Sequence, residues 1–180
     1  MNGALKIGLI AAIVVIAAAV LYFVFLSPLK PPAPNAPEST STAPSSGLCR
    51  TGNPLAGVYH PARLNVLKPC QTITGIVEKI NTEDDSDYHI NVKLDAAYSN
   101  LLVAGNDQQG GDLVIEIICA HESFQVYIQA VCRSYHKPDI ALPHVGDHIK
   151  ATGPYVIDTK HGNGGWAEIH PVWALSIFGN

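Results

Sequence analysis

The stretch YHINVKL, Tyr88–Leu94, decides the fold, because its apolar and polar residues alternate without a break. Alternation with a period of two predicts a strand with one face on a core and a polar second face. The preceding stretch QTITGIVEKI, Gln71–Ile80, is rich in β-branched residues and predicts another strand, with Gly75 at a bend or a bulge. Residues 95–111, which are polar and contain several glycines, predict a loop after it.

The rest of the chain continues this β pattern with one interruption. DLVIEIIC, Asp112–Cys119, predicts a third and mostly buried strand. Over Ser123–Tyr135 the apolar residues recur every three or four positions, which predicts a helix. His148–Ile157 and Trp166–Phe178 predict a fourth and a fifth strand, and Pro171 indicates a bulge or an edge in the fifth.

Three strands, a helix and two strands form the element order of an OB-fold, a five-stranded Greek-key barrel. The stretch VGDHIKATG, Val145–Gly153, resembles the fourth strand of many such barrels, in which a Gly-Asp turn leads into an alternating strand that ends at glycine. The resemblance covers Gln71–Asn180 and implies an all-β fold with one helix. An SH3-like barrel or a small sandwich is the alternative.

The N-terminal residues 1–26 predict a single transmembrane helix in front of this fold. Ile7–Leu26 contains 20 residues and no charge, enough to span roughly 30 Å of hydrocarbon at about 1.5 Å per residue. Residues 7–26 would thus contact membrane lipid, and Lys6 favours a cytoplasmic N-terminus. A signal peptide cleaved near Ala17–Ala19 is the alternative, although the apolar run continues past these alanines.

Residues 27–46 predict a linker and residues 47–180 a single extracytoplasmic domain. The linker contains six of the 13 prolines and many Ser and Thr residues, a composition that cannot bury a core. The remaining 134 residues suffice for one domain but not for two. We therefore expect a single-pass membrane protein whose C-terminal domain lies outside the cytoplasm.

The four cysteines of the exported part predict two disulfides, because their number is even and the compartment is oxidising. Three pairings are open, and we expect the sequence-local one, Cys49–Cys70 and Cys119–Cys132. A zinc site is the alternative, since His121 and His136 follow two of these cysteines closely. That spacing matches no common zinc module, which favours the disulfides.

A narrower resemblance rests on short motifs of the exported part: Asp87-Tyr88-His89-Ile90, Glu116-Ile117, Asp158-x-x-His161-Gly162 and Glu168-Ile169-His170-Pro171-Val172. This pattern resembles a group of short exported bacterial proteins. The resemblance implies a compact secreted β-domain and transfers no catalytic residue.

Carboxylates and imidazoles gather where an OB-type barrel binds its ligands. The loops between strands one and two and between strands four and five meet at one mouth of the barrel. Here they carry Glu83–Asp87 and Asp158–His161, and no arginine is expected at this mouth. Glu168 and His170 share one face of a regular strand. The candidate ligand or metal residues are His89, Glu116, Asp158, His161, Glu168 and His170.

Three functions are open for these residues. A divalent cation suits the mixed His and carboxylate set, although the stretch 83–87 has no calcium-loop signature. A Glu/His or Asp/His pair would suit a general base in hydrolysis. A structural role, in which the carboxylates and imidazoles pair with each other, is the simplest reading and the most frequent one for any single residue. Glu116, a charge inside an apolar strand, needs a partner in either case.

The charge of the exported part argues against nucleic-acid binding. It contains nine Lys and Arg against 14 Asp and Glu, a net charge of −5, whereas phosphate binding depends on clustered positive charge. We expect a binding or scaffolding module of the cell envelope, with an envelope protein as its partner, rather than an enzyme. The alternative is a domain that binds a divalent metal ion and could use it for hydrolysis.

Overall fold

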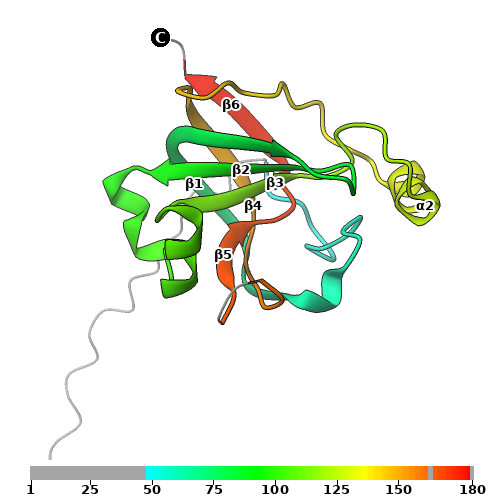
Figure 1. Ribbon diagram of the computed structural model, residues 1–180, viewed down its shortest axis with the longest axis horizontal. Coiled ribbons are helices and arrows are strands. Elements are labelled where there is room, and N and C mark those ends of the chain that lie inside the picture. Colours follow the sequence, from blue (N-terminus) through cyan, green and yellow to red (C-terminus); the bar gives the residue numbers. More distant parts are fainter. Residues whose placement is uncertain (1–47, 162–163, 179–180) are drawn as a thin grey trace, which may run out of the picture. The chain divides into compact units, whose positions relative to one another are not determined.

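The computed structural model describes residues 48–161 and 164–178, and these form a closed β-ring with small helices around it (Figure 1). The elements in chain order are η1 (Pro61–Arg63), β1 (Leu64–Thr82), β2 (Tyr88–Leu94), η2 (Ala96–Leu101), η3 (Ala104–Gln109), β3 (Leu113–Ile117), α2 (Val126–Ser134), β4 (His148–Asp158), β5 (Trp166–Ile169) and β6 (Ala174–Phe178).

The sheet closes because β1 pairs with both β2 and β4. The strand order is β1-β2-β3-β5-β4, and the additional β1–β4 pairing joins the two ends. All these pairs are antiparallel except β3–β5, which is parallel. α2 lies in the chain between β3 and β4. The predicted mostly-β class with a helix after the third strand is confirmed.

The ring encloses an aliphatic core. Ile90 and Val92 of β2 point into it, and Tyr88 and Leu94 at the ends of that strand pack against it, as the alternation predicts. Ile115 of β3 belongs to the same cluster. Fully burying one such side chain stabilises the fold by roughly 1.5–3 kcal/mol, so this cluster is the main source of stability.

β1 is longer than the predicted first strand and begins at Leu64. The pairing with β4 shifts register between Val66 and Lys68 and again before Gln71. These irregularities surround Pro69, which has no N–H to donate to a ladder. The pairing with β2 shifts at Val77–Lys79, so the predicted bulge at Gly75 is wrong by a few residues.

Gly75 instead allows a close approach of two strands. It pairs with Leu94 of β2 and with Ile149 of β4. A Cβ at this position would lie 2.7 Å from Cγ1 of Val92 and would overlap the backbone oxygen of Lys93. The glycine therefore lets β1 turn from one neighbour to the other.

Residues 95–111 differ from the predicted loop. They form the two 3-10 helices η2 and η3, and Leu101 of this segment is buried in the main core. The hydroxyl of Tyr155 on β4 donates a hydrogen bond to the Leu101 carbonyl (2.6 Å). The periodicity of a 3-10 helix is short and the segment is polar on average, which is why its sequence resembles a loop.

The predicted fifth strand is two strands. β5 ends at Ile169 and β6 begins at Ala174, and the peptide bond between His170 and Pro171 is cis. β5 pairs with β3 and β4 inside the ring, whereas β6 pairs with β4 alone. The proline expected to interrupt the strand thus divides it.

Both predicted disulfides, Cys49–Cys70 and Cys119–Cys132, are present. The first ties the N-terminal segment, residues 49–63, to β1. That segment covers the outer face of the ring, where Val58 and Leu64 pack with Ile118 and Val156 in a second, smaller core. The outer faces of β3 and β5 are also buried, and Asn106 of η3 forms hydrogen bonds with the backbone of Ala167 on β5.

No helix among residues 48–161 and 164–178 is long and apolar enough to cross a membrane. The expected anchor, residues 1–26, and the linker, residues 27–46, lie outside the described residues.

Candidate functional site

Three sequence-predicted residues meet on the outer face of the ring: Glu116 of β3, Glu168 of β5 and His170 just after β5. The register places Val114 beside Glu168 and Ile115 beside Ile169, so Glu116 lies next to His170. His170 Nδ1 is 2.9 Å from Glu116 Oε2 and 3.1 Å from Glu168 Oε2. The expectations that Glu116 finds a partner and that Glu168 and His170 share a face agree with this geometry.

The group is deeply buried, because neighbouring segments cover this face. The exposed fraction is 0% for Glu168, 2% for His170 and 7% for Glu116. The indole N–H of Trp166 donates a hydrogen bond to Glu168 Oε1. Nδ1 and both carboxylates thus have partners, as buried polar atoms require.

The protonation of this group follows from burial and mutual attraction. Burial alone would raise the pKa of Glu116, but the charge and hydrogen bond of His170 lower it. Burial alone would lower the pKa of His170, but Glu116 and Glu168 raise it. Burial, together with the Glu116 charge, raises the pKa of Glu168. The mutual attraction of His170 and Glu116 thus shifts both groups toward their charged forms, against the effect of burial.

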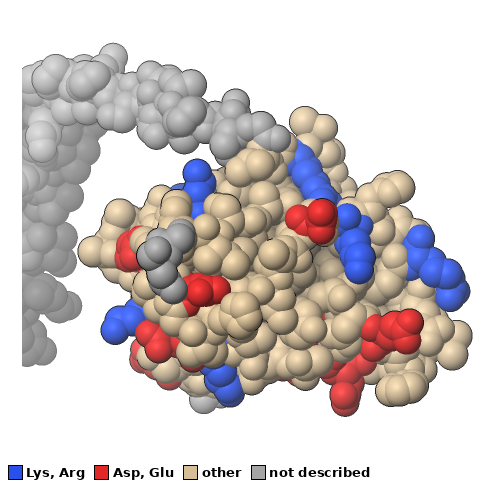
Figure 2. Space-filling model, turned by 90° about the horizontal axis from the view of Figure 1, so that it is seen from above, with Lys and Arg blue, Asp and Glu red and all other residues tan. Residues whose placement is uncertain are grey.

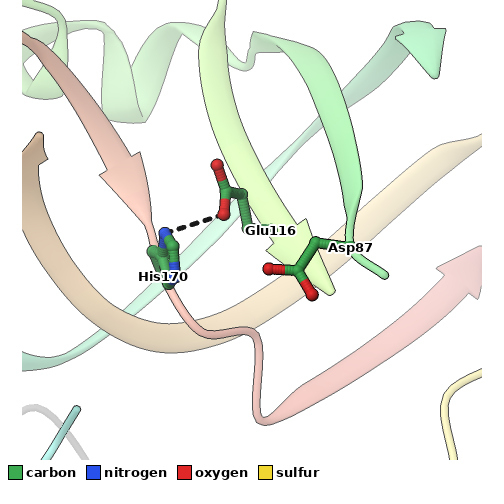
Figure 3. Close-up of side chains that lie close together, drawn as sticks. All are labelled: Asp87, Glu116 and His170. Carbon is green, nitrogen blue, oxygen red and sulfur yellow. Dashed lines mark ion pairs between the residues drawn. The ribbon is translucent and has the colours of Figure 1, made fainter. Parts of the chain in front are cut away.

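Asp87 is the next neighbour, at the start of β2. Its Oδ1 accepts a hydrogen bond from the Cys119 backbone N–H (2.8 Å). One oxygen each of Asp87 and Glu116 and one ring nitrogen of His170 lie within 4.8 Å of one another. Figure 3 shows these three side chains converging from β2, β3 and the segment after β5. Burial and the charge of Asp85 raise the pKa of Asp87 to about 8.

Asp158 and His161 form a separate group around Arg63. Arg63 Nε lies 2.8 Å from Asp158 Oδ2, and His161 Nε2 lies 3.5 Å from the same oxygen. Asp158 is fully buried, so the guanidinium compensates its charge. The expectation that no arginine reaches the mouth is wrong. The reason is that Arg63 arrives from the N-terminal segment, which the barrel prediction did not place.

A cavity of about 260 Å³ opens between these two groups. It is lined by Arg63, Glu83, Asp85, Asp87, His89, Glu116, His161 and Trp166. His161 stacks on the Trp166 ring, with centroids 4.6 Å apart, and His89 Nδ1 lies 3.8 Å from Glu116 Oε1. Four acidic side chains and one guanidinium face the space, so the acidic groups outnumber the guanidinium even when Asp87 is protonated.

The sequence-predicted residues thus divide into three places. Glu116, Glu168 and His170 form the buried group, Asp158 and His161 surround Arg63, and His89 is in the cavity wall between them. Asp87 was expected at the mouth but was not among the candidates. Its position two residues before His89, on the same face of β2, was the available signal.

Two other surface features bear on partners. On the face shown in Figure 2, positive and negative side chains are interspersed, and neither sign forms a continuous patch. Before and within α2, Phe124, Val126 and Tyr127 are exposed, and only Ile128 of the helix is buried. The helix expected to pack on the barrel is held by the buried Ile128, by the disulfide to Cys119 and by Tyr127, whose ring stacks on Tyr59.

The chain matches no protein-family model, no curated protein and no solved structure. The geometry of the described residues is therefore the basis for the function proposed below.

Proposed function

We propose that the chain is a membrane-anchored, extracytoplasmic binding module built on an OB-type barrel, and that its cavity binds a positively charged ligand. The observation that carries the proposal is the lining of that cavity, in which Glu83, Asp85, Asp87 and Glu116 outnumber the single guanidinium of Arg63. A low-dielectric wall strengthens the attraction of such a cavity for cations.

The element order and the strand order support the OB-type assignment. In that fold the loops between strands one and two and between strands four and five form the ligand-binding mouth. Residues 83–87 follow β1, and His161 follows β4, and both reach the cavity. The cavity is thus at the place where this type of barrel binds ligands, although fold alone does not determine function.

The location is tested with a reporter fused after Asn180 of the full chain in a bacterial host. A phosphatase that folds only outside the cytoplasm should be active, and a matched fusion that lacks residues 7–26 should be inactive. Activity of the second fusion, or inactivity of the first, would contradict the anchored topology.

Ligand binding is tested by the thermal stability of the full chain, purified in detergent without a histidine tag. Spermidine and divalent cations serve as positive probes, and phosphate and a single-stranded oligonucleotide as negative ones. We expect stabilisation by at least one positive probe and by neither negative one. Asp85→Asn should weaken the effect, whereas Asp107→Asn on η3, outside the cavity, should not. Stabilisation by the anions alone would overturn the proposal.

Two narrower expectations stay predictions. A hydrolytic activity would require a substrate group in the cavity beside His89 or His161, and scaffolding would require an envelope protein partner. Mutations of the exposed apolar side chains near α2 would test whether an envelope protein binds there.

A further inference from the structure

His170 has one ring nitrogen that the buried group leaves without a partner. Its Nδ1 faces Glu116 and Glu168, but Nε2 is inaccessible to solvent and has no hydrogen-bond partner among the described residues. An unpaired polar atom in an apolar interior is costly, and in native proteins it points to a function or to a bound group. The ring is held so that Nε2 faces the side on which Asp87 lies (Figure 3).

The surroundings of this nitrogen are those of a ligand histidine. Histidines that bind a metal through one ring nitrogen donate the other N–H to a carboxylate, which fixes the orientation of the ring. Here Glu168 Oε2 lies 3.1 Å from Nδ1 and Trp166 in turn donates a hydrogen bond to Glu168. Glu168 is not among the proposed ligands, so it can keep the contact with Nδ1 when an ion is bound.

The geometry points to a divalent transition-metal site, of the kind zinc prefers, formed by His170 Nε2 with the carboxylates of Asp87 and Glu116. This inference rests on the proposed cation-binding cavity and names its ligand class. One imidazole and two carboxylates suit zinc and similar ions better than calcium, which prefers oxygen ligands alone.

The distances and the access route fit such a site. One oxygen each of Asp87 and Glu116 and one ring nitrogen of His170 lie within 4.8 Å of one another, and ligands bound at about 2.1 Å from an ion lie roughly 3–4 Å apart. Closing the site on Nε2 requires Glu116 to rotate from Nδ1 toward the ion, while Glu168 continues to hold Nδ1. Asp87 and Glu116 also line the cavity, so an ion can enter from it and keep an open coordination position toward it.

The test is a zinc titration of the full chain in detergent, purified without a tag, stripped with a chelator and followed by calorimetry. The variant Asp87→Asn retains an oxygen that can accept the Cys119 N–H and removes the ligand charge. Asp84→Asn, an exposed carboxylate of the same turn, is the matched control. We expect one zinc per chain, at least about tenfold weaker binding in Asp87→Asn and unchanged binding in Asp84→Asn.

X-ray absorption of the zinc-loaded wild-type protein keeps the test independent of how the variants fold. The expected spectrum has one imidazole and oxygen ligands at about 2.0–2.1 Å. A spectrum without imidazole, or equal zinc affinity in a folded Asp87→Asn protein, would overturn the site. Stabilisation by spermidine without zinc binding would overturn the metal site and leave the cation-binding module standing. Failure of both probes would overturn both.

Discussion

At the residue scale, Glu116 shows what a local pattern can and cannot predict. A carboxylate inside the apolar run LVIEI must have a partner when buried, and the partner is His170. The need is visible in the strand itself. The identity of the partner depends on the parallel pairing of β3 with β5, which brings together residues 54 positions apart in the sequence.

Removing one charge of this buried pair should be strongly destabilising. Glu116→Gln preserves the volume but leaves His170 without its ionised neighbour, so we expect a loss of about 3 kcal/mol in the free energy of unfolding. Chemical denaturation measures the loss, and Glu122→Gln, at an exposed position, should change stability by less than about 0.5 kcal/mol. Equal stabilities of the two variants would show that the pair contributes nothing.

Asp95 gives a pH dependence that does not involve the buried group. Hydrogen bonds from Thr74 and from His148 (2.9 Å) lower the pKa of Asp95 from 3.8. Because the folded-state pKa is the lower one, the stabilisation is present above pH 3.8 and is lost as the pH falls through the folded-state value.

The variant Asp95→Asn should accordingly be less stable than the wild type at pH 6 and equally stable at strongly acidic pH. The difference should be small because the side chain is exposed. Denaturation curves at several pH values measure it. A stability difference between wild type and variant that grows toward acidic pH would contradict the predicted direction of the pH dependence.

At the element scale, β1 is the strand on which the ring depends, since it pairs with β4 over Leu64–Ile76 and with β2 over Gly75–Thr82. Gly75 lies in the part where both neighbours pair. The sequence indicated a special backbone role for this glycine. It did not indicate that the role is close approach rather than a bulge, because that depends on the strand beside it.

Gly75→Ala should cost about 3 kcal/mol, because the added methyl group meets the backbone of β2, which cannot rotate away. Gly111→Ala is the comparison: its φ of 84° is unfavourable for alanine, but the space around it is open. We expect about 1 kcal/mol there. Thermal unfolding of both variants tests whether Gly75→Ala is the more destabilising of the two. A smaller loss of stability at Gly75 than at Gly111 would contradict the prediction.

The disulfide Cys49–Cys70 holds the covering segment, residues 49–63, against the ring. Replacing both cysteines with serine should reduce the free energy of unfolding by about 3 kcal/mol, as expected for a link across a separation of 21 residues. Denaturation of the wild type with and without reductant measures the loss in the free energy of unfolding. The variant lacks the Cys49–Cys70 link, so reductant should have no effect through that link. A loss below about 1 kcal/mol would show that the segment remains in place without it.

At the scale of the whole molecule, the ring and its covering segment share one set of strands. The main core lies inside the ring, and the smaller core lies outside it against β1 and β4, which also line the main core. We therefore expect the described barrel to unfold in one cooperative step. Calorimetry of residues 47–180 should give equal calorimetric and van't Hoff enthalpies, and two separate transitions would contradict this expectation.

The sequence by itself determined the β class, the alternation of β2, the position of the helix after the third strand and the pairing of the cysteines. These features depend on the periodicity of apolar residues and on the short sequence separation of the paired cysteines. Both are local properties of a chain. All six candidate residues selected from the sequence form ion pairs with one another, and carboxylates and imidazoles are conspicuous in apolar strands.

Only the tertiary structure decided how these residues are grouped. β3 and β5 are buried on both faces, so their mostly apolar pattern does not show which face is inside the ring. The N-terminal segment packs on the outer face and brings Arg63 to Asp158, and the fold buries His170 with its free Nε2. Such an arrangement depends on contacts between segments far apart in the chain, and no local period of the sequence records them.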